Sequence, residues 1–228
     1  PTLSLLSLLN AAYNIRYKHW NNTVQVHIIN NAQNGGCPED CNYCAQAKTS
    51  DSEIEKYRLK PDEESINEAK RAYENGAHRY CMVSSGREPS EKRIKELCQT
   101  IQSIKKEVPV EVCLSAGFMS DSHAKQLKKA GLDRLNHNLN TSENHYSKIC
   151  TTHTFQDRMN TLLAAKKNNL DICSGMIVGM GESNEDIIKV ASQLNELNAP
   201  SIPINFLVPI AGTLIDKLTN LNPEKCLR

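Results

Sequence analysis

Short apolar runs alternate along this chain with longer segments whose apolar residues recur every three or four positions. The short runs predict strands over residues 23–30, 78–83, 110–115, 133–138, 170–177 and 201–208. The longer segments predict a helix over about residues 2–19 and further helices that begin near Pro61, Ser90, Ser120, Thr154 and Ser183. Regular alternation of strands and helices predicts βαβ units around a parallel sheet.

One face of these predicted strands is repeatedly polar or sulfur-bearing. Because successive side chains of a strand point to opposite faces, that face carries Gln25, His27, Arg79, Cys81, Glu111, Cys113, Ser115, Asn136, Asn138, Asp171, Cys173 and Asn205. The opposite positions, such as Val24, Val26 and Val112, are apolar and are expected to meet helices. A doubly wound sheet buries both faces, so the pattern favours a (β/α)8 barrel of the TIM type whose interior carries the chemistry.

Composition narrows the class of protein further. Lys and Arg total 27 against 26 for Asp and Glu, a net charge of +1 that predicts no nucleic-acid partner. The apolar stretches fall short of the roughly 20 residues that cross a bilayer, so we expect no membrane segment. The nine Cys are an odd number in a mid-sized α/β chain, which favours metal or catalytic use in a reducing compartment. That compartment is expected to be the cytoplasm, or the mitochondrial matrix in a eukaryote.

Three cysteines lie within one stretch of eight residues after the first predicted strand. Cys37, Cys41 and Cys44 have the spacing C-x3-C-x2-C, and Gly35 and Gly36 give the preceding backbone its freedom to turn. Three thiolates on one loop can bind three irons of a [4Fe–4S] cluster and leave the fourth iron open. Two other interpretations are a structural zinc loop and a redox C-x-x-C pair. The first needs a second ligand pair that we do not find, and the second leaves Cys37 unexplained.

Residues 36–46 (GCPEDCNYCAQ) resemble the cluster loop of the radical S-adenosylmethionine (radical SAM) superfamily, in the form found in the biotin synthase family. Five further stretches agree in the same order, and together they cover nearly the whole chain: residues 79–82 (RYCM), 135–142 (LNHNLNTS), 151–158 (TTHTFQDR), 173–182 (CSGMIVGMGE) and 201–207 (SIPINFL). The resemblance implies a (β/α)8 barrel that uses S-adenosylmethionine to insert sulfur into dethiobiotin.

The resemblance also assigns a second set of cysteines. It implies that Cys81, Cys113 and Cys173 bind a [2Fe–2S] cluster inside the barrel and so take part in catalysis. The family's fourth ligand is an Arg on a late strand, and no matching segment follows the sixth predicted strand. Three other cysteines match no family ligand and are expected to be packing residues: Cys98, Cys150 and Cys226.

The remaining site residues follow from the same resemblance. Asn136, Asn138 and Asn205 would contact dethiobiotin, whose ureido group suits side chains that both donate and accept hydrogen bonds. The contacts to S-adenosylmethionine would come from Tyr43, Ser84, Ser85, Asn138, Asn140, Arg158, Ile177 and Gly179. Within this set, Ser84 and Ser85 face the amine and Arg158 the carboxylate. We also expect Arg79, Glu111 and Asp171 to form an interior charge network.

We expect a single barrel domain over residues 1–228, with the barrel proper at about 23–228 and its last strands missing. Such a partial barrel of about six βα units would be catalytically inactive and prone to aggregate through its open edges. The expected partners are dethiobiotin, an electron donor such as flavodoxin or ferredoxin, and possibly a second copy of the chain. Two alternatives remain: another radical SAM enzyme of the hydrogenase maturase or methylornithine synthase type, and a zinc-binding protein without redox chemistry.

Overall fold

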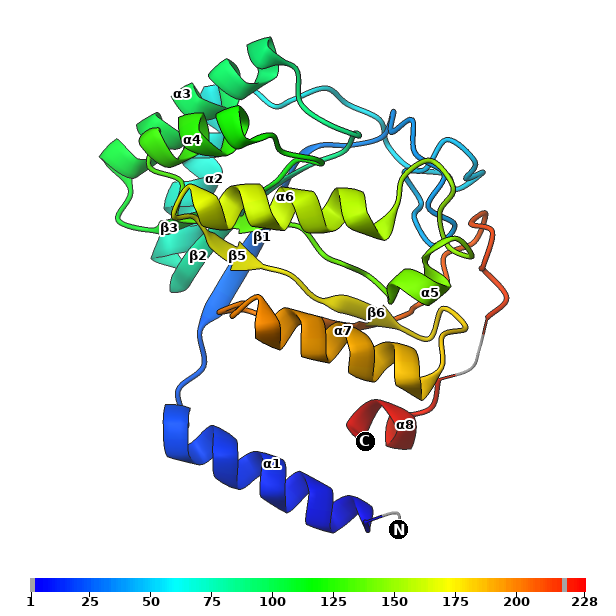
Figure 1. The fold of residues 1–228 in the computed structure, drawn as a ribbon. Helices are drawn as coiled ribbons and strands as arrows, with labels where there is room; N and C mark the ends of the chain where they lie inside the picture. Colours follow the sequence, from blue (N-terminus) through cyan, green and yellow to red (C-terminus); the bar gives the residue numbers. More distant parts are fainter. Residues whose placement is uncertain (1–2, 219–220) are drawn as a thin grey trace.

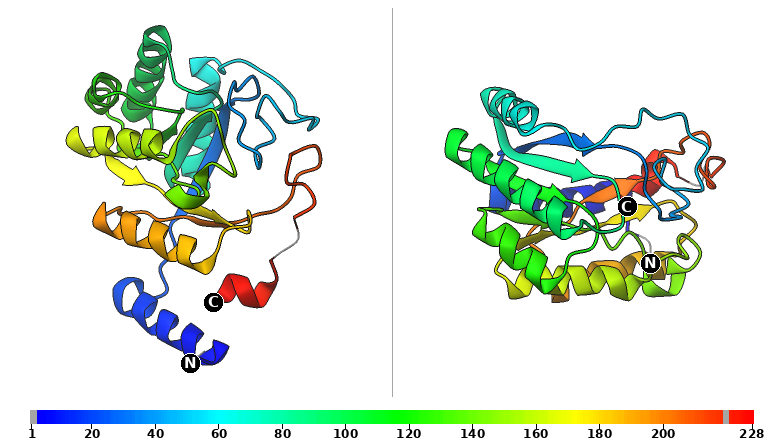
Figure 2. Two further views of the ribbon diagram at one scale, coloured as in Figure 1. Left: turned by 45° about the vertical axis from the view of Figure 1, so that its right-hand side comes forward. Right: turned by 90° about the horizontal axis from the view of Figure 1, so that it is seen from above.

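Parallel strands with an outer layer of helices form a partial barrel, which the computed structural model describes over residues 3–218 and 221–228 (Figures 1 and 2). The strands are β1 (Val26–Gln33), β2 (Ala77–Ser84), β3 (Glu111–Ser115), β4 (Arg134–Asn136), β5 (Asp171–Cys173), β6 (Met176–Val178) and β7 (Ile204–Phe206). The helices are α1 (Leu5–Trp20), α2 (Asp62–Glu74), α3 (Glu91–Glu107), α4 (Asp121–Lys129), α5 (Glu143–Tyr146), α6 (Phe155–Lys167), α7 (Asn184–Glu196) and α8 (Pro223–Leu227).

The strands are parallel and follow one another in chain order, as the alternation of elements predicts. In the described part of the chain, β1 to β5 form one sheet in the order β1-β2-β3-β4-β5, and β6 pairs with β7. Isolated parallel bridges from Asn140 to Met176 and from Cys173 to Ser201 connect the two groups. Each predicted strand segment therefore lies beside its neighbour in sequence, which is the arrangement of a barrel wall.

The segment predicted as one strand over residues 170–177 is divided into β5 and β6. The division falls at Ser174 and Gly175, where the backbone carbonyl of Pro203 comes so close that a Cβ on Gly175 would lie 1.8 Å from its oxygen. The ladder continues past the division, because Ser174 N–H donates to Ser201 O at 3.1 Å and Met176 N–H donates to Pro203 O at 3.1 Å. The split is therefore a local interruption in one barrel wall.

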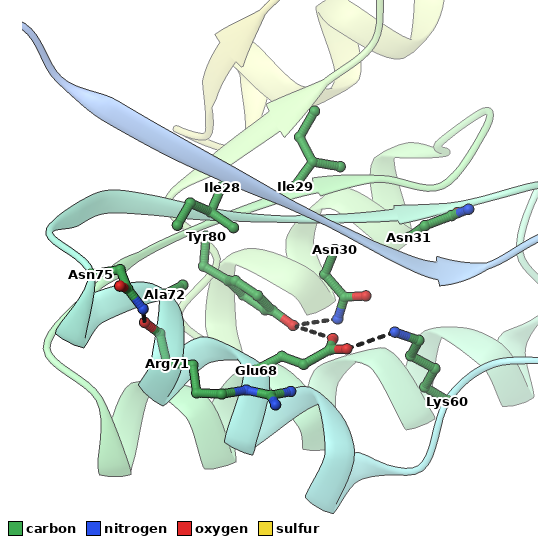
Figure 3. Close-up of a pocket in the computed structure, with 10 residues that line it drawn as sticks. All are labelled: Ile28, Ile29, Asn30, Asn31, Lys60, Glu68, Arg71, Ala72, Asn75 and Tyr80. Atoms are coloured by element: carbon green, nitrogen blue, oxygen red, sulfur yellow. Dashed lines mark hydrogen bonds and ion pairs between the residues drawn. The ribbon is translucent and has the colours of Figure 1, made fainter.

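The first strand lies three residues later than residues 23–30, and its apolar positions differ from expectation. Val24 and Val26 are 72% and 48% exposed, so the prediction that they meet helices is wrong. The reason is that α2 covers the later part of the strand, where Asn30 and Ala32 are buried. Figure 3 shows how the polar Asn30 is accommodated: it donates to Tyr80 Oη, which lies 3.3 Å from Glu68 Oε2 on α2.

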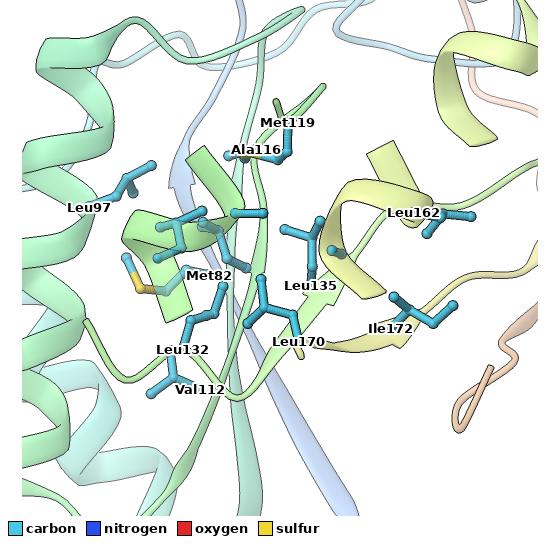
Figure 4. Packing of buried hydrophobic residues seen from close by; sticks show 14 of the residues in the cluster. Met82, Leu97, Val112, Ala116, Met119, Leu132, Leu135, Leu162, Leu170 and Ile172 are labelled. Carbon is cyan, nitrogen blue, oxygen red and sulfur yellow. The ribbon is translucent and has the colours of Figure 1, made fainter. Parts of the chain in front are cut away.

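The hydrophobic core lies between the outer face of the sheet and the helices (Figure 4). Val112 and Leu114 of β3 are fully buried, as are Ile94 and Leu97 of α3. Met82, Leu135 and Ile172 continue the same layer across β2, β4 and β5. Because this face takes the apolar side chains, the alternate positions of the strands point toward the barrel interior.

The ends of several helices agree with the capping signals in the sequence. Ser90 and Ser120 cap α3 and α4 through their side-chain oxygens. Thr154 with Asp157 and Ser183 with Asp186 each form a capping box at the start of α6 and α7. These caps determine where α6 and α7 begin, directly after the loops at the carboxyl ends of β4 and β6.

Helix α1 stands apart from the barrel, beside α8 (Figure 1). None of its described side chains is buried. Arg228, which follows the last residue of α8, donates from Nη1 to the backbone oxygen of Leu3, just before α1, at 3.0 Å. No helix among the described residues combines the length and the apolar character needed to cross a membrane.

Candidate active site

The three-cysteine loop leaves the carboxyl end of β1 and is held from both sides. Gly35 and Gly36 have φ angles of +77° and +70°, the left-handed region that favours glycine. Gly35 N–H donates to Gln46 Oε1 at 2.9 Å, and Gly35 O accepts from Ser85 Oγ at 2.6 Å. The loop is thus closed by its own Gln46 and attached to the end of β2.

Two carboxylates inside the loop connect it to the segments after α5 and after β2. Asp40 accepts the backbone N–H groups of Thr151 and Thr152 at 2.9 and 3.1 Å. Although partial burial raises the pKa of Asp40, the hydrogen bonds from Thr151 and its neighbours hold that pKa well below its usual range. Glu39 accepts from Arg87 Nη1 at 2.8 Å. Two ionised carboxylates therefore position the loop against the rest of the barrel.

A cavity of about 210 Å³ opens over this loop, and we call it the loop cavity. Its walls include all three loop cysteines together with Tyr43, Ser84, Ser85 and Arg158. Seven of the residues predicted to bind the first cluster and S-adenosylmethionine therefore surround one space. Ser84 Oγ is buried there without a hydrogen-bond partner among the described residues, which leaves it available to a ligand.

The arrangement of the loop thiols suits an iron–sulfur cluster better than a single metal ion. Among the described side chains, the three loop sulfurs do not converge within 4.8 Å of one another. A four-iron cluster binds each thiolate at a different iron, whereas one zinc ion needs convergent ligands. Burial raises the pKa of Cys37, and hydrogen bonds from the backbone N–H groups of Glu39 and Gly86 oppose that rise. These donors suit a bound thiolate.

Other predicted contacts to S-adenosylmethionine lie beside the loop cavity. Asn140 Nδ2 donates to Tyr43 Oη at 2.6 Å, and Ile177 N–H donates to Asn140 O at 2.8 Å. Gly179 lines neither this cavity nor the next; its N–H donates to Glu182 Oε1 at 2.7 Å, and Leu221 packs where a Cβ would be. The structure therefore connects Asn140 and Ile177 to the loop through Tyr43, while Gly179 belongs to a tight turn after β6.

A second cavity of about 260 Å³ lies inside the barrel, and we call it the barrel cavity. Its walls bring together the two predicted sets of residues: Cys81, Cys113, Cys173, Asn136, Asn138 and Asn205. The strand register accounts for this. Cys81 of β2 pairs with Cys113 of β3, and Asn136 of β4 pairs with Cys173 of β5. The side-chain amide of Asn138 already makes one hydrogen bond within the chain, because its Oδ1 accepts from the Gly175 N–H at 3.1 Å.

Two arginines place positive charge beside the cysteines of the barrel cavity. Arg79 pairs with Glu111, as expected, and its Nη1 also lies 2.9 Å from His27 Nε2. Asp171 does not join that pair: it lies 3.5 Å from Arg134, a residue that was not predicted to belong to the site. The hydrogen bond from Cys113 and then the charges of Arg79 and Arg134 lower the pKa of Cys81, against burial, while the same thiol–thiol bond raises the pKa of Cys113.

Arg134 could have been found from the sequence, since it shares the period-two face of Asn136 and Asn138. Cys150 could not. It was expected to be a packing residue, but its Sγ lies 3.8 Å from Cys41 Sγ and 3.1 Å from Asp40 Oδ1. The hydrogen bond from Cys41 lowers the pKa of Cys150 to about 4, although burial raises it. The packing interpretation holds for Cys98, which packs against the core, and for Cys150, which lies within it; the polar contacts of Cys150 come in addition to that packing.

The two cavities adjoin each other within the barrel. Ser115, at the end of β3, lines both of them. A group bound over the loop and a molecule bound inside the barrel would therefore meet near this residue.

Comparisons with known proteins agree with this geometry. The sequence model of the Radical SAM superfamily matches residues 34–194. The biotin synthase of Magnetococcus marinus is 53% identical over 228 residues, which cover the whole chain and 71% of that protein. The biotin synthase of Acaryochloris marina is 56% identical over 228 residues, which cover the whole chain and 66% of that protein. This chain belongs to the biotin synthase family, within the radical SAM superfamily.

Solved structures show the fold of this biotin synthase family member. Methylornithine synthase superposes with a TM-score of 0.84 at 21% identity, covering 93% of this chain and 62% of that one. The FeFe-hydrogenase maturase HydG from Carboxydothermus hydrogenoformans superposes with a TM-score of 0.84 at 20% identity, covering 99% of this chain and 55% of that one. These are the two enzyme types considered above as alternatives, and at such identities they establish the shared radical SAM barrel alone.

The chain spans between 64% and 71% of the first curated biotin synthases that it matches. Membership of the radical SAM superfamily implies a [4Fe–4S] cluster and S-adenosylmethionine, which excludes the zinc-binding alternative. The Cys37, Cys41 and Cys44 thiols in the loop cavity are the residues that fit this cluster.

Proposed function

We propose that this chain forms the catalytic barrel of a biotin synthase, which inserts sulfur into dethiobiotin using S-adenosylmethionine and two iron–sulfur clusters. The observation that carries the proposal is the pair of adjoining cavities, each lined by its own set of three cysteines and sharing Ser115. One set would hold the cluster that generates a radical, and the other would hold the cluster that supplies sulfur.

In the loop cavity, Cys37, Cys41 and Cys44 would bind the [4Fe–4S] cluster. The chemistry that such a cluster supplies when bound is one-electron cleavage of the S-adenosylmethionine sulfonium. The unpartnered Ser84 Oγ and the neighbouring Ser85 would bind the methionine amine, and the Arg158 guanidinium would face the carboxylate. Tyr43 and Asn140, hydrogen-bonded to each other, would position the ribose, with Ile177 behind Asn140.

In the barrel cavity, Cys81, Cys113 and Cys173 would bind the [2Fe–2S] cluster. Its thiolates and sulfides carry negative charge, and Arg79 and Arg134 lie beside them with Nε atoms that have no partner among the described residues. Asn136, Asn138 and Asn205 offer amide donors and acceptors to the ureido group of dethiobiotin. Because Ser115 lines both cavities, substrate held here would lie next to the site of radical formation.

The proposal includes the partners that this chemistry requires. An electron donor of the flavodoxin or ferredoxin type would reduce the first cluster in the cytoplasm or the mitochondrial matrix. A homodimer is part of the same proposal, and sedimentation of the loaded protein tests it.

One experiment separates the two cysteine sets. In the protein at the full length of its relatives, anaerobically reconstituted Cys41→Ala should form no 5′-deoxyadenosine. Cys113→Ala should cleave S-adenosylmethionine but form no biotin, and Cys98→Ala should match the parent protein in both. Biotin formation at the parent rate by Cys113→Ala would refute the proposal.

A further inference from the structure

Cys41, Cys150 and His153 converge behind the three-cysteine loop. Among the described side chains, this is the group of three or more His, Cys, Asp or Glu ligand atoms that lie within 4.8 Å of one another. We propose that these residues form a mononuclear site for a divalent cation of tetrahedral preference, Zn²⁺ or Fe²⁺, which is filled when the chain carries no iron–sulfur cluster.

The separation of the two sulfurs is that of a tetrahedral thiolate site. Zinc–sulfur bonds of about 2.3 Å and zinc–nitrogen bonds of about 2.0–2.1 Å place two sulfurs about 3.8 Å apart, and sulfur and nitrogen about 3.5 Å apart. In the structure, Cys41 Sγ and Cys150 Sγ are 3.8 Å apart. Cys150 Sγ lies 3.2 Å from His153 Nδ1 and 3.7 Å from His153 Nε2. The two sulfurs are therefore already spaced for one ion, and the imidazole, whose two nitrogens lie at similar distances from Cys150 Sγ, would rotate to direct Nε2 at that ion.

The surroundings supply the support that metal-binding histidines usually have. His153 Nδ1 is hydrogen-bonded to Glu39, so a ligating Nε2 would complete a carboxylate–histidine–metal arrangement. At present Nε2 meets Tyr146 Oη at 2.9 Å and Arg158 Nη2 at 3.1 Å, and a bound ion would replace these contacts. All three ligands are buried, with exposures of 8%, 4% and 5% for Cys41, Cys150 and His153. Two thiolates would neutralise the divalent charge.

Cys41 is common to this site and to the three-cysteine loop, so the two cannot be filled together. An ion bound to Cys41 and Cys150 removes one of the three thiolates that the cluster needs. Zn²⁺ added before iron and sulfide should therefore slow cluster assembly in the parent chain.

The test uses Co²⁺ as a spectroscopic probe on the full chain, freed of iron under anaerobic conditions. A Cys37→Ser/Cys44→Ser variant removes the other loop thiols and should still bind Co²⁺ with thiolate charge-transfer and tetrahedral d–d absorption. Adding Cys150→Ser or His153→Gln should weaken binding by more than about 100-fold, whereas Glu39→Gln, which removes an outer partner, should weaken it about 10- to 100-fold. Cys98→Ser is the matched control and should change nothing.

Three outcomes would overturn the proposal. The first is a Cys37→Ser/Cys44→Ser chain that binds no Co²⁺. The second is unchanged affinity and spectrum in both the Cys150→Ser and the His153→Gln backgrounds. The third is a Cys150→Ser single variant that fails to take up the iron and sulfide of the loop cluster, since Cys150 would then serve the cluster. A parent chain that takes up no cluster would instead refute the proposed function.

Discussion

Cys81 and Cys113 lie opposite each other on neighbouring parallel strands, and both line the barrel cavity beside Arg79 and Arg134. The two thiols influence each other's ionisation: the Cys113 thiol lowers the pKa of Cys81, and the Cys81 thiol raises the pKa of Cys113. Two adjacent thiols with arginine charge beside them are suited to bind an anionic cluster, because the positive charge favours the ligating thiolate form.

The arginine charge itself is expected to matter for the second cluster. Arg134→Met removes one of the two cations beside the cysteines but keeps most of the side-chain length. We expect this variant to retain the loop cluster and to bind the [2Fe–2S] cluster about 10- to 100-fold more weakly, the usual cost of losing a residue that supports a metal site. Iron and sulfide analysis with Mössbauer spectroscopy would measure both clusters. Lys128→Met, on the exposed side of α4, is the control and should leave both unchanged.

Asn205→Ala should weaken the binding of dethiobiotin by about 5- to 150-fold, because leaving the ureido group without this hydrogen-bond partner costs roughly 1–3 kcal/mol. Asn205 lines the barrel cavity, and no hydrogen bond within the described part of the chain engages its side chain. Equilibrium binding to the full-length protein with both clusters would measure the change. Asn160→Ala, exposed on α6, is the matched control, and an equal dissociation constant for both variants would contradict the substrate site.

The hydrogen bond between Ser142 and Asp186 is expected to make stability depend on pH. Hydrogen bonds from Ser142 and Ser183 lower the pKa of Asp186 well below its usual value. A carboxyl group of lowered pKa stabilises the fold above its unfolded pKa of about 3.9, and that contribution is lost as pH falls toward the folded value.

Asp186→Asn should therefore lower the free energy of unfolding by about 1 kcal/mol near neutral pH. The difference from the parent should persist down to about pH 4.5 and then shrink in more acidic solution. Urea unfolding at a series of pH values would measure it. Glu185→Gln, in the same turn of α7, should show a smaller difference, and a gap between Asp186→Asn and parent that widens on acidification would refute the assignment.

Gly175→Ala should destabilise the barrel wall by roughly 1–3 kcal/mol, since the new Cβ would overlap the Pro203 carbonyl and push β6 and β7 apart. Ser174→Ala is the neighbouring control. Its Oγ is buried and has no partner among the described residues, so its removal should be nearly neutral. Equal free energies of unfolding for the two variants would contradict this account of the divided strand.

Periodicity along the chain was enough to predict the barrel and most of its interior. Alternation of two residues along a strand placed Cys81, Cys113, Asn136 and Cys173 on one face, and the structure brings them to one cavity. This works because the geometry of a strand is local, so the side of the sheet on which a residue lies follows from its neighbours. The spacing of Cys37, Cys41 and Cys44 carried the cluster assignment for a similar reason, since the three thiols lie on one short loop.

Tertiary structure alone decided the features that depend on contacts between distant or irregular segments. Cys150 lies 109 residues from Cys41, in a loop whose path is determined by the hydrogen bonds of Asp40, and no periodic rule relates the two positions. The division of β5 from β6 comes from the approach of Pro203 to Gly175, and the exposure of Val24 and Val26 from the extent of α2. In each case the deciding energy is a packing or hydrogen-bond contact made after the chain has folded, which local sequence does not contain.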